Sequence, residues 1–213
     1  HIDTGMNRLG LAISEFYEII KKTTELNKLH VEWIMSHLAC GDQACEIMNK
    51  KQLSVFLNAK KKFPNVKASL ANSAGVFLGQ SYHLDMVRPG IALYGSGSGS
   101  IPPNLLEPVI KLYSRILQIR TLNSGASVGY GASYRVSKAT RVATVGLGYA
   151  DGYLRSLSNC SWVFFNGVRL PVIGRISMDY ITIDITKIAN EKIKTGDFIE
   201  IIGDKFTLDD LAT

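Results

Sequence analysis

Several polar side chains that could take part in catalysis or binding follow short apolar runs in the first half of the chain. They are His37 after VEWIMS, Asn72 and Ser73 after VKASLA, and Arg88 after DMV. Arg88 keeps its charge at any physiological pH, and Pro89 and Gly90 directly after it interrupt the ladder of a strand. The stretches 86–87 and 91–94 around this break have the apolar composition of strands. We therefore predict that Arg88 stands at a strand end that opens onto a site.

The elements that must position these residues alternate between strand and helix. Apolar residues recur at helical spacing in LAISEFYEIIKKTTEL and QACEIMNKKQLSVFLNAKKKF, and strand-like runs occur in VEWIMSHLA, VKASLANS and DMVRPGIALYG. This alternation is typical of a parallel sheet or barrel, whose active sites lie at the carboxyl ends of the strands. Arg8 follows HIDTGMN near the start of the chain. We expect Arg8, His37, Ser73 and Arg88 to share one rim.

Each of these residues also has a simpler explanation. A single histidine is more often a hydrogen-bonded core residue than a ligand, Asn-Ser is a common helix cap, and an arginine such as Arg8 is often a surface ion-pair partner. Their equivalent positions in successive strand-helix units favour function over these alternatives.

The second half of the chain has a different character. A stretch rich in glycine, serine and proline, GSGSGSIPPNLLEP at 95–108, has the composition of a linker. Strand-like runs then follow one another, and Asn166-Gly167 between two of them is a strong hairpin signal. We predict an α/β plus β fold, namely the C-terminal half of a TIM-type (β/α)8 barrel over residues 1–95 and a mainly-β domain over residues 107–213.

Composition excludes several other classes of protein. The chain has 213 residues and a net charge of +6, but its lysine runs fall on predicted amphipathic helices without aromatic platforms, so we expect no nucleic-acid partner. We expect no membrane association and no secretory leader, because no apolar run approaches a membrane span. The 3 cysteines include no CxxC pair, which predicts reduced thiols, a cytoplasmic location and no metal site.

A series of segments resembles, in this order, the signature segments of bacterial alanine racemases. They are HIDTGMNRLG, SHLACGD, ANSAG, MVRPGIALYG, VGYGASYR, GYADGYLRSLSN, NGVRLPVIGRISMDYITIDIT and the pair Gly196-Asp197. The resemblance implies an enzyme that interconverts L-alanine and D-alanine for peptidoglycan, with pyridoxal 5'-phosphate as cofactor and two bases. It also implies a barrel joined to a β domain, and a head-to-tail homodimer with sites shared across the interface.

The resemblance assigns a role to each residue at the predicted rim. Arg88 matches the arginine beside the pyridine nitrogen, and because it does not give up its proton the nitrogen stays largely unprotonated, which disfavours transamination. Ser73 and the amides of Gly90 and Ile91 would hold the cofactor phosphate. His37 matches the histidine that lies between this arginine and the base tyrosine.

Other matched residues would bind the substrate or control access to it. Arg8 matches the residue that binds the substrate carboxylate. Tyr130 matches the base on the L-alanine side, which needs a lowered phenol pKa to act at neutral pH. Met178 matches a methionine whose amide meets that carboxylate from the partner subunit. The remaining matches belong to the corridor through which substrate reaches the site: Asp42, Tyr149, Arg155 and Arg175.

Three features depart from the family pattern. His1 stands where many members carry a lysine that can be carbamylated, and Ser69 stands where a histidine is common near the pyridine-side arginine. The lysine that binds the cofactor covalently would lie on an earlier barrel strand, and a phosphate-contacting tyrosine beyond Thr213. We therefore expect the 213 residues by themselves to be inactive.

Two alternatives to alanine racemase remain open from the sequence. One is a related racemase acting on serine, lysine or a broad set of amino acids. The other is a non-catalytic pyridoxal-phosphate-binding protein, although such single-domain proteins lack a domain carrying Tyr130 and Met178.

Overall fold

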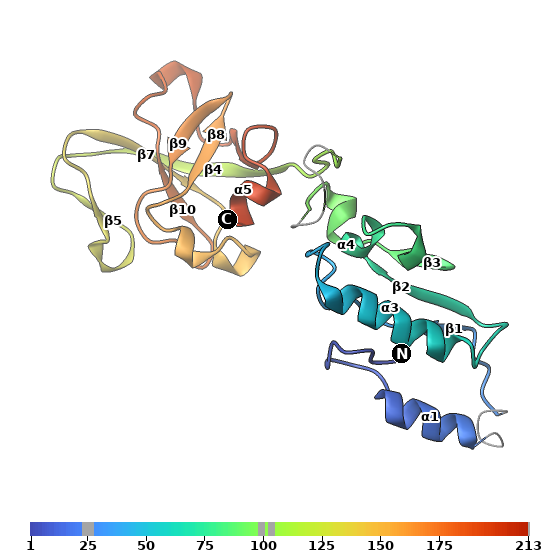
Figure 1. Ribbon diagram of the computed structural model, residues 1–213. Coiled ribbons are helices and arrows are strands. Elements are labelled where there is room, and N and C mark those ends of the chain that lie inside the picture. Colours follow the sequence, from blue (N-terminus) through green and yellow to red (C-terminus); the bar gives the residue numbers. More distant parts are fainter. Residues whose placement is uncertain (23–27, 98–100, 102–104, 213) are drawn as a thin grey trace. The chain divides into compact units, whose positions relative to one another are not determined.

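A computed structural model describes residues 1–22, 28–97, 101 and 105–212. The chain divides into two compact units, His1–Val109 and Ile110–Thr213, which we call the barrel unit and the β unit (Figure 1). Each unit is described by itself. Within the described residues, no helix is long and apolar enough to cross a membrane.

The barrel unit is built on three parallel strands in the order β1, β2, β3. Its elements follow the predicted alternation: α1 (Ile13–Lys21), β1 (Trp33–Met35), α3 (Ile47–Lys60), β2 (Lys67–Asn72), α4 (Ser73–Val76), η1 (Gln80–Tyr82), β3 (Met86–Arg88) and η2 (Ile91–Tyr94). The first residues lie beside β1, because the amide of Ile2 donates to the carbonyl of Met35 at 2.8 Å. The predicted strand-helix half of the fold is confirmed.

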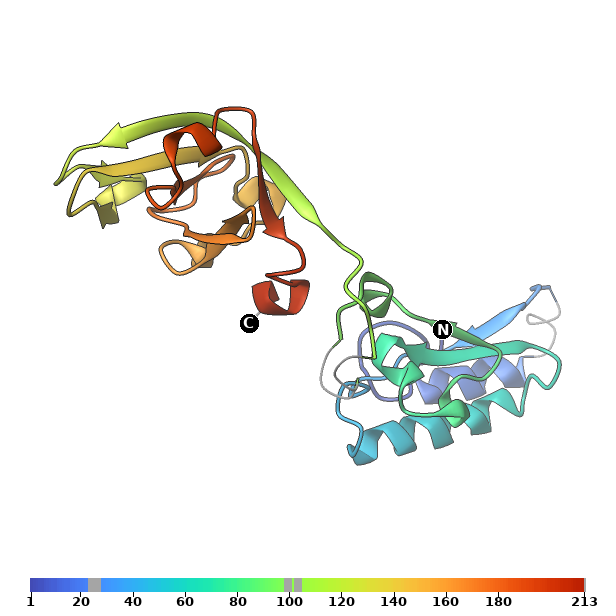
Figure 2. The ribbon, with the colours of Figure 1, turned by 90° about the horizontal axis from the view of Figure 1, so that it is seen from above.

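Helices α1 and α3 cover one side of this sheet (Figures 1 and 2). Phe16 of α1 and Phe56 of α3 pack with Ile34 of β1 and Leu70 of β2 in one apolar cluster. Phe56 and Leu70 are fully buried, and burying side chains of this size contributes about 1.5 to 3 kcal/mol each. This cluster therefore fixes the strands whose ends carry the site.

The expectation of a strand at 91–94 is wrong. These residues form the 3₁₀ helix η2, in which Leu93 donates to the carbonyl of Gly90 at 3.0 Å and Gly95 donates to that of Ala92 at 3.2 Å. The reason lies in the residues before it: proline has no amide proton to donate to a ladder, and the backbone turns at Gly90. The chain thus turns away at the rim directly after Arg88.

The β unit contains a six-stranded antiparallel sheet in the order β10, β7, β4, β11, β8, β9. Its strands are β4 (Leu112–Leu122), β7 (Thr140–Val145), β8 (Trp162–Phe165), β9 (Val168–Pro171), β10 (Ile181–Asp184) and β11 (Phe198–Ile202). A bridge between Val172 and Ile183 joins the two outer strands, so the sheet closes on itself. Closure removes the open edges of a sheet. The mainly-β half of the predicted fold is confirmed.

Short elements connect these strands. They are β5 (Ser127–Val128), η3 (Tyr130–Ala132), β6 (Tyr134–Arg135), η4 (Tyr149–Asp151), η5 (Arg155–Leu157) and η6 (Asn190–Lys192). The helix α5 (Leu208–Ala212) follows the last strand. The predicted hairpin is present between β8 and β9, where Asn166 and Gly167 both have positive φ, as a two-residue I′ turn requires. Buried isoleucines and valines from opposite strands fill the interior.

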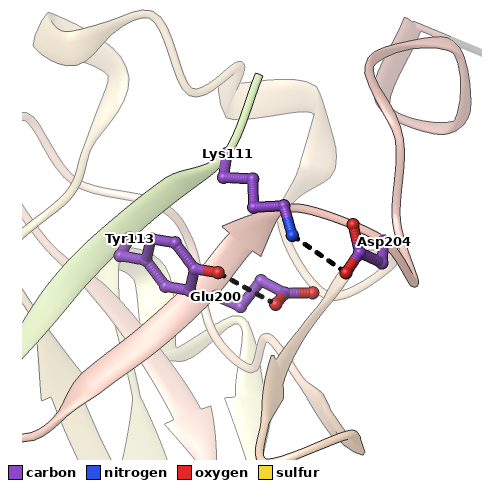
Figure 3. Close-up of polar contacts among 4 residues, drawn as sticks. All are labelled: Lys111, Tyr113, Glu200 and Asp204. Atoms are coloured by element: carbon purple, nitrogen blue, oxygen red, sulfur yellow. Dashed lines mark hydrogen bonds and ion pairs between the residues drawn. The ribbon is translucent and has the colours of Figure 1, made fainter. Parts of the chain in front are cut away.

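Two polar side-chain contacts join the first residues of the β unit to β11 and to the residues just after it (Figure 3). Lys111 Nζ lies 2.9 Å from Asp204 Oδ2, and the hydroxyl of Tyr113 donates to Glu200 Oε2 at 3.5 Å. The carboxylate of Asp204 raises the pKa of Lys111. The ion pair is exposed to solvent, so we assign it only a small part in stability.

Candidate functional site

A cavity of about 350 Å³ lies at the carboxyl ends of the three parallel strands. It is lined by His37, Ala39, Gly41, Asp42, Asn72, Ser73, Ala74, Arg88, Gly90 and Ile91. Parallel strands place their carboxyl ends at one edge, and this is where ligands bind in such sheets. The structure thus brings together His37, Ser73 and Arg88, and it adds Asn72 to them.

The guanidinium of Arg88 is held by neutral groups. It donates to the hydroxyl of Ser69, to the carbonyl of Ser36 at 2.6 Å and to that of Leu70 at 3.4 Å. Ser69 is fully buried, and its hydroxyl donates a hydrogen bond to the carbonyl of Met86 at 2.8 Å. No acidic side chain pairs with Arg88 in the described part of the chain. Its charge is therefore left for a ligand in the cavity, although burial lowers its pKa.

His37 lies between two hydrogen-bond donors. Its Nδ1 is 3.5 Å from Arg88 Nη2, and its Nε2 is 3.3 Å from Asn72 Nδ2. A neutral imidazole has one acceptor nitrogen, whereas an imidazolium has none, so two donors disfavour the protonated ring. Burial lowers the pKa of His37, and the charges of Arg8 and Arg88 lower it further. The structure therefore holds a neutral histidine at the cavity wall.

The hydroxyl of Ser73 organises the turn after β3. It accepts the amide of Gly90 at 2.7 Å and that of Ala92 at 3.3 Å. A serine hydroxyl has two acceptor lone pairs and one proton. Since both lone pairs are used, its proton is free to be donated to an anionic oxygen in the cavity.

Arg8 is exposed and does not line this cavity, although its charge acts on His37. It belongs to a loop whose two ends are joined by backbone hydrogen bonds. The amide of Asp3 donates to the carbonyl of Leu11 at 2.8 Å, and the amide of Leu11 donates to the carbonyl of His1 at 2.9 Å. The carboxylate of Asp3 accepts the amides of Gly5 and Met6, and these bonds lower its pKa. These hydrogen bonds therefore hold the start and the end of the loop in place beside the rim.

The β unit gathers the other predicted residues on neighbouring loops. The amide of Tyr149 donates to the carbonyl of Ser177 at 3.0 Å, and that of Ala150 donates to the carbonyl of Met178 at 3.0 Å. A Cβ on Gly129 would overlap the amide of Arg175, so the loop of Tyr130 passes directly against it. Tyr130 is 69% exposed and Met178 is 55% exposed.

Two of the predicted corridor residues share a second cavity of about 560 Å³ in the β unit. Arg155 and Arg175 line it together with Ser133, Ser156, Ser158 and Asn159. The loops around it are joined by Asn159, which accepts the amide of Gly174 at 2.6 Å, and by Ser158, which accepts that of Ile176 at 3.1 Å. The fourth corridor residue, Asp42, lines the barrel-unit cavity instead.

Sequence reasoning missed a group of buried polar residues behind the first cavity. They are Thr4, Ser36, Asn49 and Gln52. The available signal was their spacing: Asn49 and Gln52 are three residues apart, and Phe56 follows four residues later. In a helix this spacing places all three side chains on one face. Because Lys50 and Lys51 lie between them in the sequence, that face is easily taken for a solvated one.

These features define a class of protein: a strand-helix unit with a cationic cavity at its strand ends, followed by a closed antiparallel sheet. Comparison with known families assigns both halves. The model of the alanine racemase N-terminal domain matches residues 1–98, and that of the alanine racemase C-terminal domain matches residues 109–213. The chain belongs to the alanine racemase family.

Individual relatives agree with this assignment. The chain is 44% identical to a protein of Agrobacterium fabrum named "Alanine racemase, catabolic" and 41% identical to an alanine racemase of Brucella abortus, covering 99% of the chain in both cases. These matches take in 54% and 56% of the relatives, so the chain spans about half of their length.

Solved structures show the same fold. The alanine racemase of Bartonella henselae with covalently bound pyridoxal phosphate has a TM-score of 0.86 and 42% identity, covering 99% of this chain and 58% of that one. The biosynthetic alanine racemase of Pseudomonas aeruginosa has a TM-score of 0.78 and 32% identity, covering 99% of this chain and 59% of that one.

Proposed function

We propose that the whole protein interconverts L-alanine and D-alanine with pyridoxal 5'-phosphate as its cofactor. One observation carries this proposal: Arg88 and Ser73 line the same cavity. Arg88 is a permanent cation held by neutral groups, and the hydroxyl of Ser73 has a proton free for a ligand. The family membership and the pyridoxal phosphate bound by the Bartonella henselae relative support it.

The residues of the cavity fit this cofactor. Its phosphate needs donors, which the hydroxyl of Ser73 and the amide of Ile91 would supply, and close approach to the backbone, which Gly90 allows at the turn after β3. The amide of Gly90, expected to hold the phosphate as well, donates to Ser73 Oγ instead. A Cβ on Gly90 would stand 3.8 Å from Ser73 Oγ, in the space where an anion would contact that hydroxyl. When bound, the cofactor supplies a ring that withdraws electrons from the substrate and acidifies its α-hydrogen.

The side chains of this chain would then divide the work. Arg88 donates a hydrogen bond to the ring nitrogen and gives up no proton to it, which limits side reactions. His37 stays neutral beside it, and Arg8 binds the substrate carboxylate with paired donors. Tyr130 takes the α-proton on the L-alanine side. The exposed guanidiniums of Arg155 and Arg175, with Tyr149 and Asp42, would select small zwitterions in the corridor.

We also propose a homodimer in which Tyr130 and Met178 of one subunit complete the cavity of the other. The high exposure of both side chains supports this, because residues that act on a substrate must be covered when it is bound. A cytoplasmic location, with D-alanine serving peptidoglycan synthesis, belongs to the same proposal.

A substrate panel tests the proposed activity. The whole protein, loaded with pyridoxal phosphate, is incubated separately with L-alanine, L-serine and L-lysine, and the D-isomer is measured by chiral chromatography. We expect alanine to give the highest kcat/KM. A preference for serine or lysine would identify a different racemase, and cofactor binding without turnover of any of them would identify a non-catalytic binding protein.

A further inference from the structure

One buried amide lies directly behind the cavity wall. Gln52 of α3 has no exposed surface, and its side chain uses both of its functional groups. Nε2 donates to the carbonyl of His37 at 2.8 Å and to Thr4 Oγ1 at 3.2 Å, and Oε1 accepts the amide of Ala39 at 2.9 Å. It therefore fixes the backbone at His37 and at Ala39, two residues later.

The same bonds reach the two arginines of the proposed site. Thr4 belongs to the tied loop that carries Arg8, and its hydroxyl lies 2.7 Å from Ser36 Oγ. The carbonyl of Ser36 in turn accepts a hydrogen bond from Arg88 at 2.6 Å. Thr4, Ser36 and Gln52 are all buried and lie outside the cavity lining. They form one polar cluster that joins α3 to the segment of His37 and to the loop that carries Arg8, in addition to the backbone hydrogen bond from Ile2 to Met35.

We propose that Gln52 is a positioning residue, which holds the His37 imidazole against Arg88 and Asn72 and sets the loop of Arg8 relative to it. In its catalytic consequence this inference rests on the proposed function. Catalysis is sensitive to such placement, because a displacement of about 1 Å far from the chemistry can cost about 100-fold in rate.

The neighbouring residue Asn49 provides a matched control. It is on the same helix three residues earlier, is 1% exposed, and donates to the carbonyls of Cys40 and Gln43 at 2.9 Å each. It therefore has the same burial and a similar number of bonds to the same loop, but none to His37 or Thr4. A general effect of losing a buried amide should appear at both positions.

The test replaces Gln52 by methionine, which keeps the length of the side chain and removes its hydrogen bonds. The readout is the titration of the His37 imidazole by NMR in the whole protein, with its resonance assigned by loss in a His37→Gln variant. The charged groups facing this ring are Arg8 and Arg88, and Asp42 lines the same cavity. If the ring moves away from the arginines and into water, its pKa rises toward the ordinary value.

We expect Gln52→Met to raise the pKa of His37 and to lower kcat/KM for alanine roughly 10- to 100-fold. Asn49→Met should lower the unfolding temperature without moving the titration. An unchanged titration in folded Gln52→Met, or the same shift in Asn49→Met, would overturn the inference. If Gln52→Met does not fold, Gln52→Asn is measured instead, since it is neutral and too short to make all three bonds.

The two proposals fail separately in this experiment. The titration of His37 does not require racemisation. A wild-type protein that does not act on alanine would refute the proposed function, while a shift in Gln52→Met would still support the positioning of His37.

Discussion

At the scale of single residues, the site is defined by a guanidinium that has no ion-pair partner among the described residues and by a neutral imidazole beside it. Arg88 is held by a serine hydroxyl and by carbonyls, and His37 faces two donors. Both arrangements favour a bound group that supplies acceptors and negative charge. Tyr130 differs from them, because it lies on an exposed turn of the β unit and its role depends on what covers it.

Removing the hydroxyl of Tyr130 tests its proposed role as a base. In the whole protein, Tyr130→Phe should lower kcat for alanine by about 10² to 10⁴, the usual contribution of a positioned general base. The side chain is 69% exposed, so the unfolding temperature and the absorbance of the cofactor should stay as they are. Tyr134→Phe on the adjacent strand β6 is the control and should keep its activity. Turnover of Tyr130→Phe within a few-fold of wild type would refute the assignment.

The lowered pKa of His37 predicts how stability depends on pH. In the unfolded chain its pKa returns to about 6.5, so between this value and the lower folded value the unfolded state binds more protons. The stabilisation is therefore complete above about pH 6.5 and is lost as the pH falls toward the folded pKa.

Urea unfolding of wild type and His37→Gln at several pH values measures this effect. The difference in free energy of unfolding between them should change in favour of the variant as the pH is lowered from about 8 to about 5. His30→Gln, an exposed position outside the site, is the control for exchanging a histidine for a glutamine. A difference that is constant over this range would contradict the predicted direction.

At the scale of elements, tight backbone contacts hold the loops that carry the proposed substrate residues. Gly148 is the clearest case, because a Cβ there would overlap the carbonyl of Met178. The adjacent amides of Tyr149 and Ala150 bond to the loop of Met178 at 3.0 Å. The position of Met178 therefore depends on the absence of a side chain at Gly148.

Gly148→Ala should destabilise the whole protein by about 1 to 3 kcal/mol, the usual cost of overpacking against an unyielding backbone. It should also raise KM for alanine, since Met178 is displaced. Gly146→Ala is the control: its Cβ would meet only a flexible leucine, Leu117, at 3.3 Å, and its cost should stay within about 1 kcal/mol. Equal effects of the two substitutions would show that the close approach at Gly148 is unimportant.

The elements that the sequence predicts well are those whose local pattern and packing agree. The three strands of the barrel unit combine apolar runs with polar ends, and the Asn166-Gly167 hairpin has the turn residues that its geometry needs. The helix η2 was missed because the apolar residues 91–94 suit a strand, whereas hydrogen bonds to Ser73 and Gly90 decide their conformation. Such non-local bonds leave no periodicity in the sequence.

The same limit explains what was missed in the site. Arg88, His37 and Ser73 were found because they stand at strand ends, and Ser69 was noted only as a departure from the family pattern near Arg88. In the structure the hydroxyl of Ser69 itself accepts a hydrogen bond from Arg88. Gln52 was missed because its value lies in partners that are 13 to 48 residues away, which helical spacing does not reveal.

At the scale of the whole molecule, the described lining of the proposed cofactor cavity includes no lysine. The 213-residue chain, incubated with pyridoxal phosphate and reduced with borohydride, should therefore not be labelled at a single lysine to completion. Mass spectrometry of the digested protein measures the label at each position. Stoichiometric labelling of one lysine, together with turnover of alanine, would show that a residue of this chain binds the cofactor covalently.

The central claim is that the barrel unit of one subunit and the β unit of another form each racemase site. It is tested by mixing two variants of the whole protein, Arg8→Ala in the barrel unit and Tyr130→Phe in the β unit, after dissociation and reassembly. Each variant alone should be nearly inactive. Random reassociation makes about half of the dimers mixed, and each of these has one site free of substitutions, so about a quarter of wild-type activity should return. A mixture no more active than the mean of the two variants would contradict the claim.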